Sequence, residues 1–176
     1  MPAQKPDQFD ITSPDQPADA SRSNWEDQIA GFWASFNGDN ADAMVALMRE
    51  LASQCPYQDG RADYELGGVF DSVGREHDAL EYYERALVKG LDAERTAQMR
   101  IQHASTLRNV GRPDDAVAML SDGEERDDAT AVFLALALHS ADRKDEALSV
   151  ALTALADHLP RFGRSARAYA EDLLNQ

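Results

Sequence analysis

Apolar positions recur along most of the chain with the three- and four-residue spacing of amphipathic α-helices. The clearest example lies between Tyr64 and Leu87, where Gly74 separates two apolar stripes. The first stripe consists of Leu66, Val69, Phe70 and Val73, and the second of Ala79, Leu80, Tyr83, Ala86 and Leu87. The small residues Gly67, Gly68 and Ala79 stand where two helices have to approach closely. This stretch therefore predicts two short helices folded back on each other.

Comparable stripes predict helices on both sides of this hairpin, from a first helix starting near Ser23 or Asn24 to a last one over Arg164–Leu174. Residues 1–22 are rich in Pro, Asp, Gln, Ser and Ala and carry almost no large apolar side chains. Such a segment cannot bury enough surface to offset the entropy of ordering it. We therefore expect a disordered tail over residues 1–22 and a single helical domain over residues 23–176.

The hairpin pattern repeats along the chain. An acidic residue followed by alanine opens the second helix of each copy, at Asp42-Ala43, Asp78-Ala79, Asp115-Ala116 and Glu146-Ala147. Successive alanines are 36, 37 and 31 residues apart. Five residues before each alanine stand Gly38, Gly74, Gly111 and, in the last copy, Asp142. A period of about 34 residues with helix-turn-helix content is typical of a helical repeat array.

The best-preserved copy resembles the tetratricopeptide repeat, through Leu66-Gly67-x-x-Phe70 and Ala79-x-x-x-Tyr83. It departs from that signature at Asp63, where tryptophan is usual, and near Leu91, where the closing proline is missing. The resemblance implies an all-α fold: a right-handed superhelical solenoid of antiparallel helical hairpins, with about four repeats and a C-terminal capping helix.

Further segments resemble one bacterial, mostly actinobacterial, tetratricopeptide family over roughly residues 60–175. They are LASQ at 51–54, ALVKGLDAE at 86–94, HASTLRNVGR at 103–112 and FLALALHSADR at 133–143. Members of that family have no assigned reaction. The resemblance therefore carries an expectation about the fold and leaves the function open.

Composition narrows the choice of partners. The formal net charge is −15, with a pI of about 4.5, which disfavours binding to nucleic acid or anionic lipid and favours basic or neutral partners. The same charge could simply keep the protein in solution. Cys55 is the single cysteine, so no internal disulfide can form. No apolar run approaches the length of a membrane span, and the first ten residues contain no apolar signal segment, so we expect a cytoplasmic protein.

Candidate chemistry is sparse. The four histidines, His77, His103, His139 and His158, are spread over four different helices or turns. The sequence contains no paired metal-ligand spacing, no phosphate-binding glycine loop and no nucleophile beside a base. The cluster Glu76-His77-Asp78 falls in a first helical turn, where acidic residues complement the helix dipole. We therefore expect no enzymatic activity, no cofactor and no metal.

The surface with most potential is the concave one, which in this repeat class is lined by the first helix of each hairpin. The resemblance places seven polar or aromatic candidates for partner binding there: Arg61, Tyr64, Asp71, Gln98, Arg108, Asn109 and His139. Arginine pairs carboxylates through two parallel hydrogen bonds, and asparagine can hold a peptide backbone, so this strip suits a peptide with acidic groups. Arg108 and Asn109 could equally brace neighbouring helices.

The sequence thus favours a non-enzymatic scaffold that binds a peptide or protein partner in its concave groove. The alternative is a self-assembling homo-oligomer whose groove is filled by a second subunit. An open polar groove with accessible Arg61 and Arg108 would favour the scaffold. A groove blocked by Trp33 or by the final helix would favour self-assembly.

Overall fold

The computed structural model describes residues 16–122 and 127–175, and across these ranges the chain is helical with no β-strand. The α-helices are α1 (Gln16–Ala34), α2 (Ala41–Ser53), α3 (Arg61–Ser72), α4 (Glu76–Lys89), α5 (Ala93–Asn109), α6 (Pro113–Ser121), α7 (Asp128–Ser140), α8 (Lys144–Ala156) and α9 (Gly163–Asp172). Two short 3₁₀-helices, η1 (Gly38–Asn40) and η2 (Leu173–Asn175), precede α2 and follow α9.

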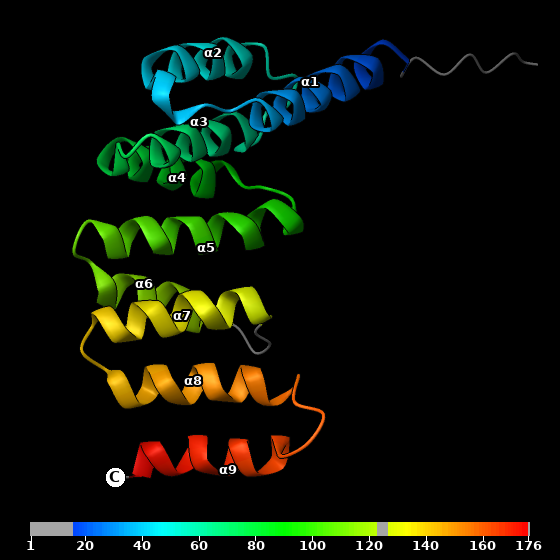
Figure 1. The fold of residues 1–176 in the computed structure, drawn as a ribbon. Coiled ribbons are helices and arrows are strands. Elements are labelled where there is room, and N and C mark those ends of the chain that lie inside the picture. Colours follow the sequence, from blue (N-terminus) through cyan, green and yellow to red (C-terminus); the bar gives the residue numbers. More distant parts are fainter. Residues whose placement is uncertain (1–15, 123–126, 176) are drawn as a thin grey trace, which may run out of the picture.

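The helices stack in chain order into an elongated array, with α1 and α2 at one end and α9 at the other (Figure 1). The tightest packing is within the pairs α3–α4, α5–α6 and α7–α8, and each pair also contacts the next. The first helices of successive pairs touch one another, α3 with α5 and α5 with α7, so they share one face of the array. This arrangement confirms the all-α solenoid of helical hairpins.

Helix α1 is longer than the sequence pattern predicts. It begins at Gln16, seven residues before Ser23, and Asp19 in its first turn complements the helix dipole. Apolar periodicity gives no signal there, because residues 19–24 are exposed and polar or small. Residues 1–15 lie outside the described ranges, so the proposed division of the chain into tail and domain stays a prediction.

Left-handed residues join the two helices of three hairpins. Gly74, Gly111 and Asp142 have φ values of 74°, 81° and 61°, a conformation that costs little for glycine and more for a residue with a Cβ. These are three of the four positions that the repeat pattern singles out. The fourth, Gly38, instead opens the 3₁₀-helix η1, so the first hairpin turns differently.

An arginine follows each of these left-handed residues and closes the turn in the same way each time. Its backbone N–H donates a 2.9 Å hydrogen bond to the carbonyl oxygen five residues earlier, in the pairs Arg75–Phe70, Arg112–Leu107 and Arg143–Leu138. Its side chain pairs with the acidic residue three positions later, in Arg75–Asp78, Arg112–Asp115 and Arg143–Glu146. The acidic half of the acid–alanine motif is therefore part of the turn.

The alanine half of the motif is buried between helices: Ala79 and Ala116 are fully inaccessible. Close approach is also required at Gly67, where a Cβ would lie 2.5 Å from the ring of Tyr83 in α4. The prediction that small residues mark the contact between α3 and α4 is confirmed. This contact fixes the position of α3, and thereby of the side chains that α3 presents on its other face.

Candidate partner-binding cavity

A cavity of about 370 Å³ lies where α1, α3, α4 and α5 meet. Its wall combines aromatic, acidic and amide side chains from three successive hairpins. The lining residues are Trp33, Tyr64, Glu65, Gly68, Asp71, Ser72, Tyr83, Glu94, Arg95, Gln98 and Gln102. We refer to this space as the α3–α5 cavity.

Trp33 forms the wall of the cavity on the α1 side. Its indole Nε1–H donates a 2.6 Å hydrogen bond to Oε2 of Glu65. A Cβ added at Gly68 would lie 3.1 Å from Cζ2 of the indole, so α1 and α3 are already close at this point. The rings of Phe32 and Phe36 pack against the indole with centroid distances of 5.1 and 5.6 Å. The orientation of Trp33 is therefore fixed from both sides.

Two carboxylates of α3 lie in the cavity wall. Glu65 is only 5% exposed, whereas Asp71, six residues later, is half-buried and accepts a 2.9 Å hydrogen bond from the Thr106 hydroxyl. Burial raises the pKa of both carboxyl groups, and the hydrogen bonds from Trp33 and Thr106 offset this only in part. No Lys or Arg of the described residues forms an ion pair with either carboxylate.

Neutral hydrogen-bonding groups complete the lining. The Tyr64 hydroxyl donates to Oε1 of Gln98 over 3.3 Å, and the Tyr83 hydroxyl donates to Oε1 of Gln102 over 3.4 Å. Burial raises the pKa of Tyr64 to about 12 and also raises the pKa of Tyr83, so both phenols are protonated at neutral pH. These long, weak hydrogen bonds leave the two amides able to exchange partners.

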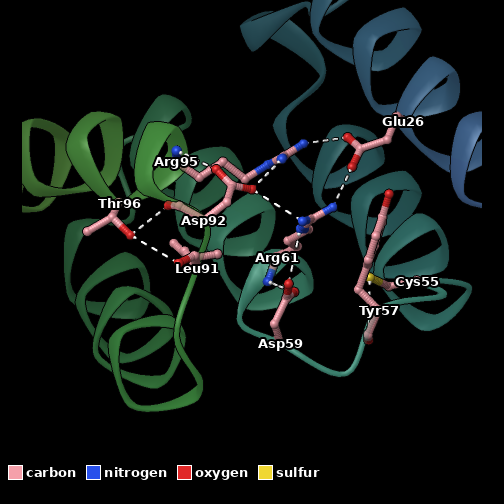
Figure 2. Close-up of polar contacts among 9 residues, drawn as sticks. All are labelled: Glu26, Cys55, Tyr57, Asp59, Arg61, Leu91, Asp92, Arg95 and Thr96. Atoms are coloured by element: carbon pink, nitrogen blue, oxygen red, sulfur yellow. Dashed lines mark hydrogen bonds and ion pairs between the residues drawn. The ribbon is translucent and has the colours of Figure 1, made fainter.

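Arg95 is the one cation in the lining, and its charge is already matched by carboxylates outside the cavity (Figure 2). Its guanidinium pairs with Glu26 of α1 and, over 2.8 Å, with Asp92. Asp92 also caps α5 by accepting the backbone N–H of Arg95 over 2.9 Å. That backbone hydrogen bond and the one from the Arg95 side chain lower the pKa of Asp92.

Arg61 belongs to the same ion-pair network and does not line the cavity (Figure 2). Its guanidinium lies 3.0 Å from Glu26, 3.1 Å from Asp59 and 3.3 Å from Asp92. It also stacks on the Tyr57 ring, 3.7 Å from the ring centroid. With its side chain 17% exposed, Arg61 ties α1, α3 and α5 together.

The seven sequence-predicted candidates thus fall into separate places. Tyr64, Asp71 and Gln98 line the cavity. Arg108 and Asn109 lie about two turns beyond Gln102, at the end of α5, where the Arg108 guanidinium donates a 3.1 Å hydrogen bond to Asn109. His139 is exposed in the last turn of α7. Arg61 lies in the ion-pair network.

Sequence reasoning missed the other carboxylates of the cavity, Glu65 and Glu94, and considered Trp33 as a residue that could block the groove, whereas it forms one wall of the cavity. Glu65 follows Tyr64 directly on α3, so the expectation that α3 lines the groove could have suggested it. The contact between Trp33 and Glu65 spans 32 residues, and no periodic pattern within one helix reveals it.

Residues 16–122 and 127–175 contain no group of three or more His, Cys, Asp or Glu side chains placed to hold a metal ion. None of their helices is both long and apolar enough to cross a membrane.

Stacked helical hairpins whose first helices share one face define the chain as a helical-repeat protein. A family model described as Tetratrico peptide repeat matches residues 60–173, and the chain belongs to this family. Proteins of this family generally act as non-catalytic scaffolds that bind proteins or peptides. No curated protein and no solved structure matches the chain. The matched region excludes α1, so Trp33 is contributed to the cavity from outside it. The resemblance to an actinobacterial subfamily stays a prediction.

Proposed function

We propose that the protein is a non-enzymatic scaffold that binds a peptide or protein partner in the α3–α5 cavity. The observation that carries this proposal is the cavity itself, because three successive hairpins turn polar and aromatic side chains toward one space of about 370 Å³. The volume is within the range of known ligand sites, about 300–1,000 Å³, and several polar groups converge on the space.

Of the predicted contacts, Tyr64, Asp71 and Gln98 are the ones we assign to the partner directly. Arg108, Asn109 and His139 would be reached only by a partner that extends beyond the cavity along the array. Arg61 is engaged by three carboxylates, and we assign it to holding the helices together.

We also propose a cytoplasmic protein that does not bind nucleic acid or membranes. The support for the absence of nucleic acid and membrane binding is the net charge of −15, which repels phosphate groups and anionic lipid headgroups. The same charge favours partners that are basic where they meet the cavity.

The test is retention of partners from a cell lysate by immobilised protein. Gln98 is exposed on α5 at the cavity, so Gln98→Trp fills the space from its rim. Ala97→Trp places the same side chain at the neighbouring exposed position, outside the lining. A partner kept by wild type and Ala97→Trp but lost by Gln98→Trp supports the proposal. Equal retention by all three proteins contradicts it.

Self-association is a second candidate, because apolar side chains are exposed at the C-terminal end of the array. Leu155, Phe162 and Tyr169 are 52%, 74% and 69% exposed. Light scattering during size exclusion tests this candidate. A concentration-dependent dimer that Phe162→Ser with Tyr169→Ser abolishes would favour it, and a monomer at all concentrations would exclude it.

A further inference from the structure

The α3–α5 cavity has an imbalance of charge that specifies its ligand more closely than the fold does. Three carboxylates line it, Glu65, Asp71 and Glu94, against one cation, Arg95. The Arg95 charge is matched by Glu26 and Asp92, which do not line the cavity. The negative charge of the lining carboxylates therefore favours a positively charged ligand in the cavity.

The buried carboxylates have unused acceptor capacity. Oε2 of Glu65 accepts from Trp33 and Oδ1 of Asp71 accepts from Thr106, while no described residue donates to Oε1 of Glu65 or Oδ2 of Asp71. Both of these free oxygens keep some solvent-accessible surface, and both residues line the cavity. Glu65 is 95% buried without a direct ion pair among the described residues, and a carboxylate in that position is costly unless something else compensates its charge.

We propose that the cavity binds an arginine or lysine side chain of the partner, with its cationic group paired to a lining carboxylate, Glu65 or Asp71. This inference rests on the proposed function and names the chemistry of the group that enters. The volume of about 370 Å³ accommodates one long basic side chain.

The remaining lining groups fit such a side chain. The amide oxygens of Gln98 and Gln102 can accept further N–H donors when they exchange their weak tyrosine hydrogen bonds. The aromatic side chains Trp33 and Tyr64 line the same space and can contact the apolar stem of a long basic side chain. Glu94, exposed at the start of α5, draws positive charge toward the rim. An acidic side chain or a carboxyl terminus would meet like charge in the same place.

The experiment uses fluorescein-labelled pentapeptides of glycine with one central residue: arginine, lysine, citrulline or glutamate. Citrulline keeps the shape of arginine and removes its charge. Fluorescence anisotropy is expected to show saturable binding of the arginine or lysine peptide to the wild-type protein, weakening as salt is added. The citrulline and glutamate peptides are expected to bind at least about tenfold more weakly, the ratio of a charge-assisted hydrogen bond to none.

The variant Glu65→Gln with Asp71→Asn keeps both side-chain shapes and both acceptors for Trp33 and Thr106. It is expected to lose about tenfold or more in affinity for the basic peptide. Glu81→Gln with Glu84→Gln makes the same change of net charge on the exposed side of α4 and is expected to leave the affinity unchanged. Circular dichroism confirms that each variant is folded.

If the variant Glu65→Gln with Asp71→Asn does not fold, a substitution of Glu94 at the rim of the cavity tests the same inference. Glu94 and Asp145 are both exposed, and each is the second residue of its helix. Glu94→Lys and Asp145→Lys therefore destabilise their helices by the same loss of favourable interaction with the helix dipole. Glu94→Lys is expected to lower the affinity for the basic peptide several-fold, and Asp145→Lys is expected to leave that affinity unchanged.

No saturable binding of the basic peptides in the millimolar range, or binding of the glutamate peptide as tight as theirs, overturns the inference. Failure of the proposed function looks different. If Gln98→Trp releases the lysate partner but basic peptides do not bind, the scaffold function stands and the inference falls. If basic peptides bind but Gln98→Trp and wild type retain the same partners, the scaffold function falls.

Discussion

Trp33 and Glu65 are joined by a 2.6 Å hydrogen bond from the indole N–H to the carboxylate, which ties α1 to α3 at the wall of the cavity. The bond satisfies one carboxylate oxygen, and no described Lys or Arg forms a direct ion pair with Glu65, on which Arg95 acts only from a greater distance. A folded protein that keeps such a residue is expected to lose stability by it, unless a ligand supplies the missing charge.

Glu65→Gln is therefore expected to raise the free energy of unfolding, by about 1 kcal/mol. The amide oxygen still accepts from Trp33, and the buried charge is gone. Denaturation in urea measures the change. Asp63→Asn is the matched control, since Asp63 is equally buried on α3, at 6% exposed, but paired with Lys89 and Arg85. That change should lower stability by about 1–2 kcal/mol. A large loss in Glu65→Gln would show that the carboxylate is compensated in the free protein.

His103 makes the fold sensitive to acid. The residue is 3% exposed, its ring centroid lies 5.6 Å from that of Tyr83, and neither ring nitrogen forms a hydrogen bond to a described residue. Burial, with Arg112 nearby, lowers the pKa of His103 to about 4. The unfolded chain, with a histidine pKa of about 6.5, binds the proton more tightly, so stability falls as the pH drops from about 6.5 to about 4.

The loss due to His103 amounts to at most about 3 kcal/mol. Glu65 and Asp71, whose pKa values are raised in the fold, act in the opposite direction over the acidic range. The test is therefore the difference in pH dependence between wild type and His103→Phe. The variant should lose less stability between pH 6.5 and 4, and parallel curves for the two proteins would contradict the assignment.

Substitutions at two of the left-handed turn residues are expected to change the melting temperature in opposite directions. Asp142 has a φ of 61° and a Cβ, whereas its counterpart Gly111 has a φ of 81° and no neighbour within 4 Å of the Cβ position. Asp142→Gly is expected to raise the melting temperature by about 2 °C, and Gly111→Ala to lower it by about 3 °C. The exposed ion pair of Asp142 with Lys144 is expected to matter little. The same sign for both variants would contradict the repeat turn described above.

Glu26 is expected to hold α1 against the rest of the array. It pairs with Arg61 of α3 and Arg95 of α5. The other contacts of α1 with these two helices are made by Trp33 and by the hydrophobic core. Glu26→Gln should speed amide exchange in α1 several-fold and lower stability by about 1 kcal/mol, with a smaller effect at high salt. Asp27→Asn, an exposed neighbour outside the network, is the control and should leave exchange in α1 unchanged.

Much of the fold could be predicted from the sequence, because each hairpin carries its own signals. The apolar stripes, the glycine turns and the acid–alanine motif are all local, and they place the α3–α4 hairpin and α9 within a few residues. The start of α1 could not be predicted in this way, since residues 19–24 are polar or small and exposed on the helix. A helix that contacts its neighbours with only its second half has no apolar stripe in its first half.

The candidate site was harder to predict, because its properties depend on contacts between hairpins. The repeat pattern placed Tyr64, Asp71 and Gln98 on the inner face. It could not show that Arg61 forms an ion pair with Glu26, 35 residues earlier, or that Glu65 is buried without a direct ion pair among the described residues. As a result, the predicted polar strip suggested a peptide with acidic groups. The carboxylates that line the cavity instead favour a ligand with a basic group.

The most direct measurement uses the two tryptophans of the chain. The Trp33 indole N–H lies at the cavity on Glu65, and the Trp25 indole N–H is buried in a 2.8 Å hydrogen bond to the Leu51 carbonyl. In a ¹⁵N–¹H spectrum, titration with the arginine pentapeptide should shift the Trp33 indole signal in a saturable manner and leave Trp25 in place. The glutamate pentapeptide should shift neither signal. An unchanged Trp33 signal, or equal shifts of both tryptophans, would contradict binding in the α3–α5 cavity.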